Sequence, residues 1–305
     1  MKIKFWGVRG SIPCPGSHTM KYGGNTLCIE LRLVEPERIV IIDAGTGIRE
    51  LGNHLIAHDL PKGPIRAEIF LTHTHWDHIQ GFPFFLPIYN PESKFTVYGP
   101  VTYEEETIKD VLGGQWIYRY FPVRQTELAS EMEYVDLKEG RYDLGDGIKL
   151  TTQYLNHPLL CLGYRFEHNG KVFCTAFDTE PFQNIFCSDP DDPSYDETVI
   201  LEAEEAVKEQ NQRLEQFFFG ADLLVYDTQY TQEEYESSKI GWGHASIEHA
   251  ITSANRSEVK RLALFHHEPV RTDAQLDELA EKYCNSGSEG GTEVFFAREG
   301  MQIEF

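Results

Sequence analysis

A short stretch of the sequence carries four side chains that commonly bind metal ions. Residues 71–82 read LTHTHWDHIQGF, and the candidate ligands in it are His73, His75, Asp77 and His78. The stretch follows the apolar segment AEIFL, which is typical of a buried strand. His73 and His75 are two residues apart, so they project to the same side of an extended chain. Four such residues together favour a site for two metal ions, roughly 3.5–4 Å apart, over a cluster of surface histidines.

Further ligand-type residues follow other strand-like segments. His157 comes after KLTTQYLN, Asp178 after KVFCTAF, and the neighbours His266 and His267 after RLALF. A single histidine at the end of a strand is more often structural. Because these residues accompany an already dense cluster, we expect them to gather with it at one edge of the predicted sheets.

Such a site requires strands that end close together, and the sequence predicts them. Runs rich in β-branched and aromatic residues recur in two batches along the chain, and helical patterns occupy 47–58, 102–112, 245–254 and 273–284. We therefore predict an α/β (α+β) fold with two mixed β-sheets packed together and helices outside them.

One segment interrupts this pattern. Residues 186–197 contain five carboxylates and two prolines, which predicts an exposed loop. Apolar residues at 199, 203, 206, 207, 214 and 217 then predict an amphipathic helix. A helix packed on the common core is favoured over a lid or a dimerisation arm. No repeat or low-complexity linker divides the 305 residues, so we predict a single domain.

Charge and composition exclude several classes of function. The net charge of −22 argues against a partner that is a long nucleic acid, because such a partner needs a basic face. No apolar run is long enough to span a membrane, and MKIKFWGVRG has no apolar signal core, so we expect a cytoplasmic protein without membrane contact. The six cysteines form no CxxC pair, which favours free thiols over disulfides.

The sequence HTHWDH matches the HxHxDH signature of the metallo-β-lactamase fold hydrolases. The chain resembles that family from about residue 3 to its C-terminus. This resemblance implies a four-layer αββα sandwich that forms one domain over residues 1–305, with an acidic loop-plus-helix insertion at about 186–219.

The resemblance also implies a set of ligands. One metal ion would be held by His73, His75 and His157, and a second by Asp77, His78 and His266, with Asp178 bridging both. The choice of His266 over His267 follows the family's placement of a ligand at the strand end. Asp43, at the end of the strand-like RIVIID, would orient a ligating histidine, although a helix N-cap is an equally good role for it.

A histidine at position 75 suits a hydrolytic site with two divalent metal ions, typically zinc, with manganese and iron as alternatives. Such ions would lower the pKa of a bridging water enough to give hydroxide at neutral pH. The segment GWGHASIEHAI resembles the HxS/T element of the ribonuclease Z-like phosphodiesterase branch. This implies that His244 lies beside the metal ions and assists the leaving group. The alternative is that His244 merely precedes a helix. Asp77 and His244 are our predicted catalytic residues.

The opening KFWGVRGSIPCPG resembles a bacterial subgroup of the same branch, in which Arg9 and Asn25 would contact substrate or else pin the N-terminal hairpin. The chain lacks the Gly/Pro-rich basic arm with which ribonuclease Z clasps transfer RNA. We therefore predict a phosphodiesterase for small substrates such as cyclic nucleotides or cyclic phosphates. The alternatives are a carboxyl-ester, thioester or lactone hydrolase and a non-catalytic metal-bound sensor. A homodimer is common in the family resembled and is possible here, and the sequence leaves the oligomeric state open.

Overall fold

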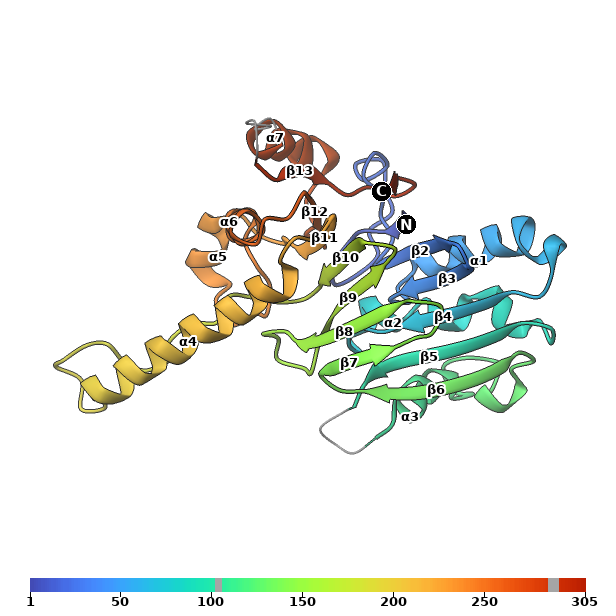
Figure 1. Ribbon diagram of the computed structural model, residues 1–305, viewed down its shortest axis with the longest axis horizontal. Coiled ribbons are helices and arrows are strands. Elements are labelled where there is room, and N and C mark those ends of the chain that lie inside the picture. The colour runs from blue at the N-terminus through green and yellow to red at the C-terminus, as the bar shows by residue number, and fades with distance from the viewer. Residues whose placement is uncertain (102–105, 285–290) are drawn as a thin grey trace.

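The structure, a computed structural model, describes residues 1–101, 106–284 and 291–305. Within these residues the strands form two mixed sheets of seven strands each (Figure 1). In spatial order, sheet one consists of β14 (Gln302–Glu304), β1 (Lys2–Gly7), β2 (Cys28–Val34), β3 (Glu37–Ile42), β4 (Arg66–Phe70), β5 (Lys94–Pro100) and β6 (Glu131–Leu137). Sheet two consists of β13 (Glu293–Phe296), β12 (Arg261–Phe265), β11 (Leu223–Asp227), β10 (Lys171–Ala176), β9 (Leu162–His168), β8 (Lys149–Tyr154) and β7 (Gly140–Asp143).

Each sheet is half parallel and half antiparallel. In sheet one, β3, β4, β5 and β6 run parallel to one another. In sheet two, β10, β11, β12 and β13 do the same. Parallel neighbours end at the same edge of a sheet, which is where open α/β sheets usually bind ligands. The carboxyl ends of these strands are therefore the place to look for a functional site.

The layers are defined by three apolar cores. The core between the sheets contains Phe5 and Phe70 from sheet one and Phe166 and Phe265 from sheet two. It forms because side chains alternate between the two faces of each strand, as the burial of β1 shows. A second core lies between sheet one and its helices, and a third between sheet two and its helices. The predicted arrangement of two mixed sheets with outer helices is confirmed.

The α-helices that surround the sheets are α1 (Gly47–His58), α2 (Trp76–Ile79), α3 (Ile108–Gly113), α4 (Glu197–Phe218), α5 (Gln232–Ser238), α6 (Ile247–Arg256) and α7 (Asp273–Tyr283). Short 3₁₀ turns are η1 (Leu60–Lys62), η2 (Phe82–Phe84), η3 (Leu86–Tyr89), η4 (Gly114–Trp116) and η5 (Gln125–Glu127). The predicted helix at 47–58 has the observed bounds of α1. The first part of the helix predicted at 102–112, residues 102–105, lies outside the described residues.

Helix α4 projects from the body of the protein, with residues 186–196 at its far end (Figure 1). Its N-cap is Asp196, whose carboxylate accepts hydrogen bonds from the amides of Thr198 and Val199. Only its last turns, through Leu214, Phe217 and Phe218, join the core of sheet two. The prediction that this helix packs on the common core therefore holds for its C-terminal end alone. Whether 186–219 is an insertion stays a prediction.

Two further properties follow from the described residues. None of their helices combines the length and the apolar character that crossing a bilayer requires. All six cysteines carry free thiols, in agreement with the prediction from their spacing.

Candidate metal centre

The candidate ligands come from the carboxyl ends of strands in both sheets. His73 and its neighbours follow β4, Asp178 follows β10, and His266 directly follows β12. His157 comes from the loop after β8. The two sheets face each other, so these strand ends converge on one point.

The first cluster contains His73, His75, His157 and Asp178, whose ligand atoms all lie within 4.8 Å of one another. Nδ1 of His75 faces Nε2 of His157 at 3.1 Å. Nε2 of His73 lies 3.5 Å from Oδ2 of Asp178. Nδ1 of His157 donates to the carbonyl oxygen of Gly243 at 3.0 Å, which fixes the ring and leaves its Nε2 facing the cluster.

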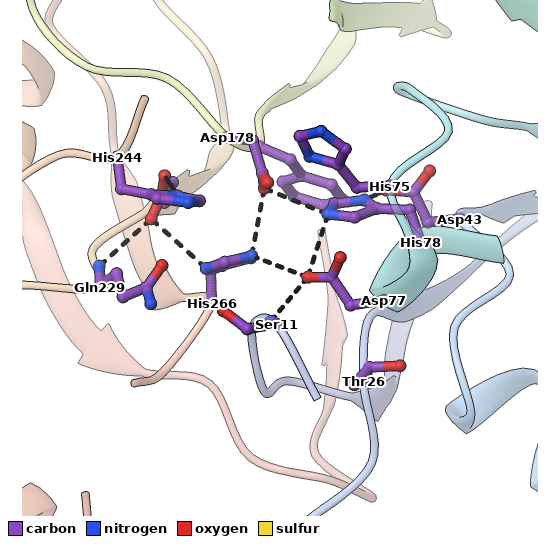
Figure 2. A network of polar contacts seen from close by, with 12 residues as sticks. Ser11, Thr26, Asp43, His75, Asp77, His78, Asp178, Gln229, His244 and His266 are labelled. Atoms are coloured by element: carbon purple, nitrogen blue, oxygen red, sulfur yellow. Dashed lines mark hydrogen bonds and ion pairs between the residues drawn. The ribbon is translucent and has the colours of Figure 1, made fainter. Parts of the chain in front are cut away.

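The second cluster contains Asp77, His78, Asp178 and His266, and all four residues are buried. Figure 2 shows Asp178 between the two histidines, with its Oδ1 at 3.2 Å from Nε2 of each. Nε2 of His266 also lies 3.3 Å from Oδ2 of Asp77. Because Asp178 belongs to both clusters, the two groups are adjacent and share one carboxylate.

The chemistry of these residues fits a pair of divalent cations. Within the described residues, the ion pairs of Asp43, Asp77, Asp178 and Asp227 are all with histidines, and none is with lysine or arginine. Buried carboxylates require a positive partner. Nε2 of His73, Nε2 of His78 and Oδ1 of Asp178 are also buried without a hydrogen bond to any described residue. Both features are expected of ligand atoms that face metal ions.

In the metal-free protein, protonated histidines balance the carboxylates. Burial disfavours the charged form of His78, but Asp178, Asp77 and Asp43 outweigh it and raise the pKa of His78 well above its usual value. The same balance, with Asp178 and Asp227, raises the pKa of His266 to about 9. Burial dominates at His73 and lowers its pKa. Since metal binding requires neutral histidines, it would displace protons from His78 and His266.

Asp43 orients one of these histidines. Its Oδ2 accepts a hydrogen bond from Nδ1 of His78 at 2.7 Å, and its Oδ1 accepts one from the amide of Thr72 at 2.7 Å. Helix α1 has Thr46 at its N-cap, without a side-chain hydrogen bond. Of the two roles open to Asp43 from the sequence, its contacts correspond to that of orienting a histidine rather than that of capping a helix.

The backbone is in the left-handed conformation at three strand ends of the site. The φ angles are 59° at Asp43, 46° at Asp178 and 60° at His266. Residues with a Cβ rarely adopt this conformation, and it persists only where the surrounding structure enforces it. Here it turns each side chain from the end of its strand toward the shared cluster.

A contact from the N-terminal loop completes the second cluster, and the sequence did not predict it. The amide of Ser11 donates to Oδ2 of Asp77 at 2.7 Å (Figure 2). The neighbouring Gly10 lies against His266, because a Cβ at Gly10 would be 2.2 Å from Cε1 of that ring. The partners of Ser11 and Gly10 are distant in the chain, so no local pattern predicted these contacts.

Arg9 holds this loop in place through a buried side chain. Its side chain is fully buried and donates to the carbonyl oxygens of Gly23, Glu268 and Arg271 at 2.7–3.1 Å. Asn25 donates to Glu299 at 3.0 Å. These contacts correspond to the second of the two roles, that of pinning the N-terminal hairpin.

We expect Gly10→Ala to weaken metal binding at the second cluster by roughly 10- to 100-fold, as changes next to metal ligands often do. The new methyl group would displace the His266 ring. Calorimetric titration of the metal-free protein with zinc would measure the affinity of each site. Gly16→Ala in the same loop is the control, because the nearest atom to a Cβ there, Oγ1 of Thr19, is 4.0 Å away. Equal zinc affinities of the second cluster in the two variants would contradict the assignment of His266 as a ligand.

His267 points away from both clusters. Its Nε2 approaches the carbonyl oxygen of Ala297 at 2.7 Å, and its ring packs against Tyr22 and Phe296. Burial lowers the pKa of His267 to about 3. The structure thus separates the two neighbouring histidines that the sequence could not distinguish by spacing.

Because the pKa of His267 is depressed on folding, the unfolded chain binds a proton more readily than the folded one. This histidine therefore contributes stability above about pH 6.5 that is lost as the pH falls toward 3. We expect His267→Asn to reduce the loss of unfolding free energy between about pH 7.5 and pH 5 by roughly 2 kcal/mol. Urea unfolding of the metal-free wild type and of the metal-free variant at the two pH values would measure this difference. An equal change in unfolding free energy in both proteins would contradict the prediction.

His244 lies beside the second cluster and is held by a carboxylate that the sequence did not identify. Its Nδ1 donates to Oδ2 of Asp227 at 2.8 Å. Its ring stacks on His266 with centroids 4.8 Å apart. Asp227 is the last residue of β11, so its position at the end of a buried strand was the available signal.

The comparisons with known proteins agree with this arrangement. The family model of the beta-lactamase superfamily domain matches residues 38–188. A ribonuclease Z from Lactococcus lactis subsp. lactis (strain IL1403) is 27% identical over 293 residues, covering 87% of this chain and 88% of that protein. The metallo-beta-lactamase fold protein YhfI from Bacillus subtilis has a TM-score of 0.63 at 15% identity and covers 100% of this chain and 99% of its own. A diphosphatase from the PhnP family has a TM-score of 0.61 at 16% identity and covers 100% of this chain and 97% of its own.

Proposed function

We propose that this chain, which belongs to the metallo-β-lactamase fold hydrolases related to ribonuclease Z, is a dinuclear-metal phosphodiesterase that cleaves small phosphodiesters. The observation that carries the proposal is the pair of adjacent His/Asp clusters with the His244–Asp227 pair beside them. The two clusters support hydrolysis by metal ions. The His244–Asp227 pair supports a reaction in which the leaving oxygen needs a proton.

For the site, we propose that His73, His75 and His157 hold one ion and that Asp77, His78 and His266 hold the other. Asp178 would bridge the two, as its place in both clusters suggests. Nitrogen and carboxylate ligands suit zinc, with manganese and iron as alternatives. Two such ions would lower the pKa of a water molecule and stabilise the negative charge that develops on the phosphate.

The other residues would orient these groups and move one proton. Asp43 and the carbonyl oxygen of Gly243 fix the rings of His78 and His157, so that their Nε2 atoms face the clusters. Asp227 accepts from Nδ1 of His244, which leaves Nε2 of His244 to donate a proton to the departing alkoxide. Proton donation of this kind is worth roughly 10²- to 10⁴-fold in rate.

A small substrate is favoured by charge. The net charge is −22, and the projecting α4 with the loop before it is rich in carboxylates. Both would repel a long polyanion such as transfer RNA, whereas a single phosphodiester group has only one charge to place beside the cations. The proposal therefore differs from the activity in the name of the ribonuclease Z relative.

The test combines metal content with activity on one sample. Zinc-loaded protein should contain about two ions per chain by mass spectrometry and should hydrolyse bis(p-nitrophenyl) phosphate and cyclic nucleotides until a chelator is added. The same assays are made with manganese-loaded protein to compare the two metal ions. A precursor transfer RNA and a thioester are added as alternative substrates. Turnover of thioesters or lactones alone would indicate a carbonyl hydrolase, turnover of the RNA alone a nuclease, and two bound ions without any turnover a sensor.

A further inference from the structure

The residues in and beside the two clusters differ in their exposure to solvent. His73, Asp178 and the second cluster are buried, whereas His75 is exposed. The side chain of His244 is 12% exposed. We therefore expect a substrate to approach the clusters over His75 and His244.

Two exposed tryptophans arise at these same places. Trp76 is 78% exposed and lies between His75 and Asp77, while Trp242 is 57% exposed and precedes Gly243 and His244. His75 and Gly243 both contact His157, at 3.1 Å and 3.0 Å. Each tryptophan is therefore the chain neighbour of a residue that contacts His157.

Their exposure is selective within this chain. The sequence has four tryptophans, and the other two are shielded: Trp116 is 3% exposed, and Trp6 is half-buried and donates to Glu30 at 2.9 Å. Single exposed apolar residues are common on protein surfaces and need no explanation. Here both exposed tryptophans are next to residues of the site. Recognition of a ligand therefore explains their exposure better than chance does.

The loop that carries Trp242 is held in a defined position. The amide of Trp242 donates to the carbonyl oxygen of Lys239 at 3.1 Å, and the amide of Gly241 donates to Glu180 at 2.9 Å. Nζ of Lys239 lies 3.9 Å from the centre of the Trp242 ring and 5.3 Å from that of Tyr230. Tyr230 in turn lies 6.1 Å from the His244 ring. The lysine thus braces the indole and places a positive charge at the entrance.

We propose that Trp76 and Trp242 bind the planar aromatic ester group of the substrate that stays on phosphorus after cleavage. The substrate class would then be phosphodiesters that carry a nucleoside or an aryl group, rather than those with alkyl groups alone. Stacking on an indole is worth roughly 5- to 100-fold in affinity per ring and is tolerant of which ring is bound. Lys239 would attract the anionic phosphate to the same entrance. This inference rests on the proposed phosphodiesterase activity.

The experiment compares two substrates with the same leaving group. Bis(p-nitrophenyl) phosphate and methyl p-nitrophenyl phosphate both release p-nitrophenolate, but only the first keeps an aryl group on phosphorus. In Trp242→Leu and Trp76→Leu, we expect the ratio of their kcat/KM values to fall by roughly tenfold, mainly through KM of the diaryl substrate. Phe219→Leu is the control, since Phe219 is 44% exposed beyond the end of α4. Cyclic nucleotides would show whether a nucleobase is bound in the same way.

A second measurement separates this inference from the proposed function. Binding of phenyl phosphate and of methyl phosphate to the zinc-loaded protein can be compared by calorimetry, without turnover. A preference for the phenyl compound that both Trp→Leu variants lose would support the aromatic site even if no phosphodiester were cleaved. Wild-type turnover with unchanged substrate ratios in both variants would overturn the inference and leave the phosphodiesterase proposal intact.

Discussion

Replacing Asp178 by alanine is expected to lower the kcat/KM for bis(p-nitrophenyl) phosphate by roughly a thousandfold. Bound metal ions are worth several kcal/mol of transition-state stabilisation, and each 1.36 kcal/mol corresponds to about a factor of ten in rate. Asp178 is the residue that belongs to both clusters, with oxygens facing His73, His78 and His266. Its loss should therefore affect both metal sites at once and lower the metal content from about two ions per chain to one or fewer.

Asp222→Ala separates loss of the site from loss of a buried carboxylate. Asp222 is 5% exposed, accepts from the amide of Val172 at 2.8 Å and from Nζ of Lys260 at 2.7 Å, and lies just before β11. It stands at the opposite end of that strand from Asp227. The variant should lose stability but keep its metal content. Full activity in Asp178→Ala, or equal metal content in the two variants, would refute the bridging role.

His244→Ala should lower the hydrolysis of phosphodiesters with poor leaving groups by roughly 10²- to 10⁴-fold. The variant lacks the imidazole ring that would donate a proton to the leaving alkoxide. In the wild type, Asp227 holds that ring in place. A good leaving group such as p-nitrophenolate needs less help, so bis(p-nitrophenyl) phosphate should lose less activity than a cyclic nucleotide. The comparison of the two substrates is the measurement.

Metal analysis of the same variant distinguishes a proton donor from a ligand. Asp227 and His244 form a further group with Asp178 and His266 in which an ion could be held. If His244 donates a proton, the variant keeps about two ions per chain. A fall in metal content would assign His244 to the metal site instead. His249→Ala is the control, because His249 lies on α6 with its ring next to Tyr226.

The sequence predicted the parts of the site that depend on local pattern. HTHWDH follows an apolar strand, and Asp178 and His266 each follow another. Their convergence required the strands to run parallel within each sheet and the two sheets to face each other with these ends on the same side. The two sheets and the outer helices follow from the same alternation of apolar residues. Helix α5 was missed because its sequence, QEEYESS, is almost entirely polar and only Tyr235 is buried.

The rest of the site depends on how the two sheets pack, which local pattern does not encode. Ser11 contacts Asp77 across 66 residues of sequence, and Asp77 contacts His266 across 189. Gly10 resembles any loop glycine until the His266 ring is placed beside it. Asp227 ends a strand just as Asp178 does, but only the fold shows that its partner is His244. The ligand roles of all these residues stay predictions until metal is bound and counted.

The left-handed backbone at Asp43, Asp178 and His266 has a consequence for engineering this protein. Each such residue costs on the order of 1 kcal/mol relative to glycine, which adopts that conformation freely. A selection for heat resistance alone would therefore favour glycine at these three positions and would remove two candidate ligands and the carboxylate that orients a third. Stabilising libraries should keep these codons fixed and seek their gains elsewhere, for example on the exposed surface of α4.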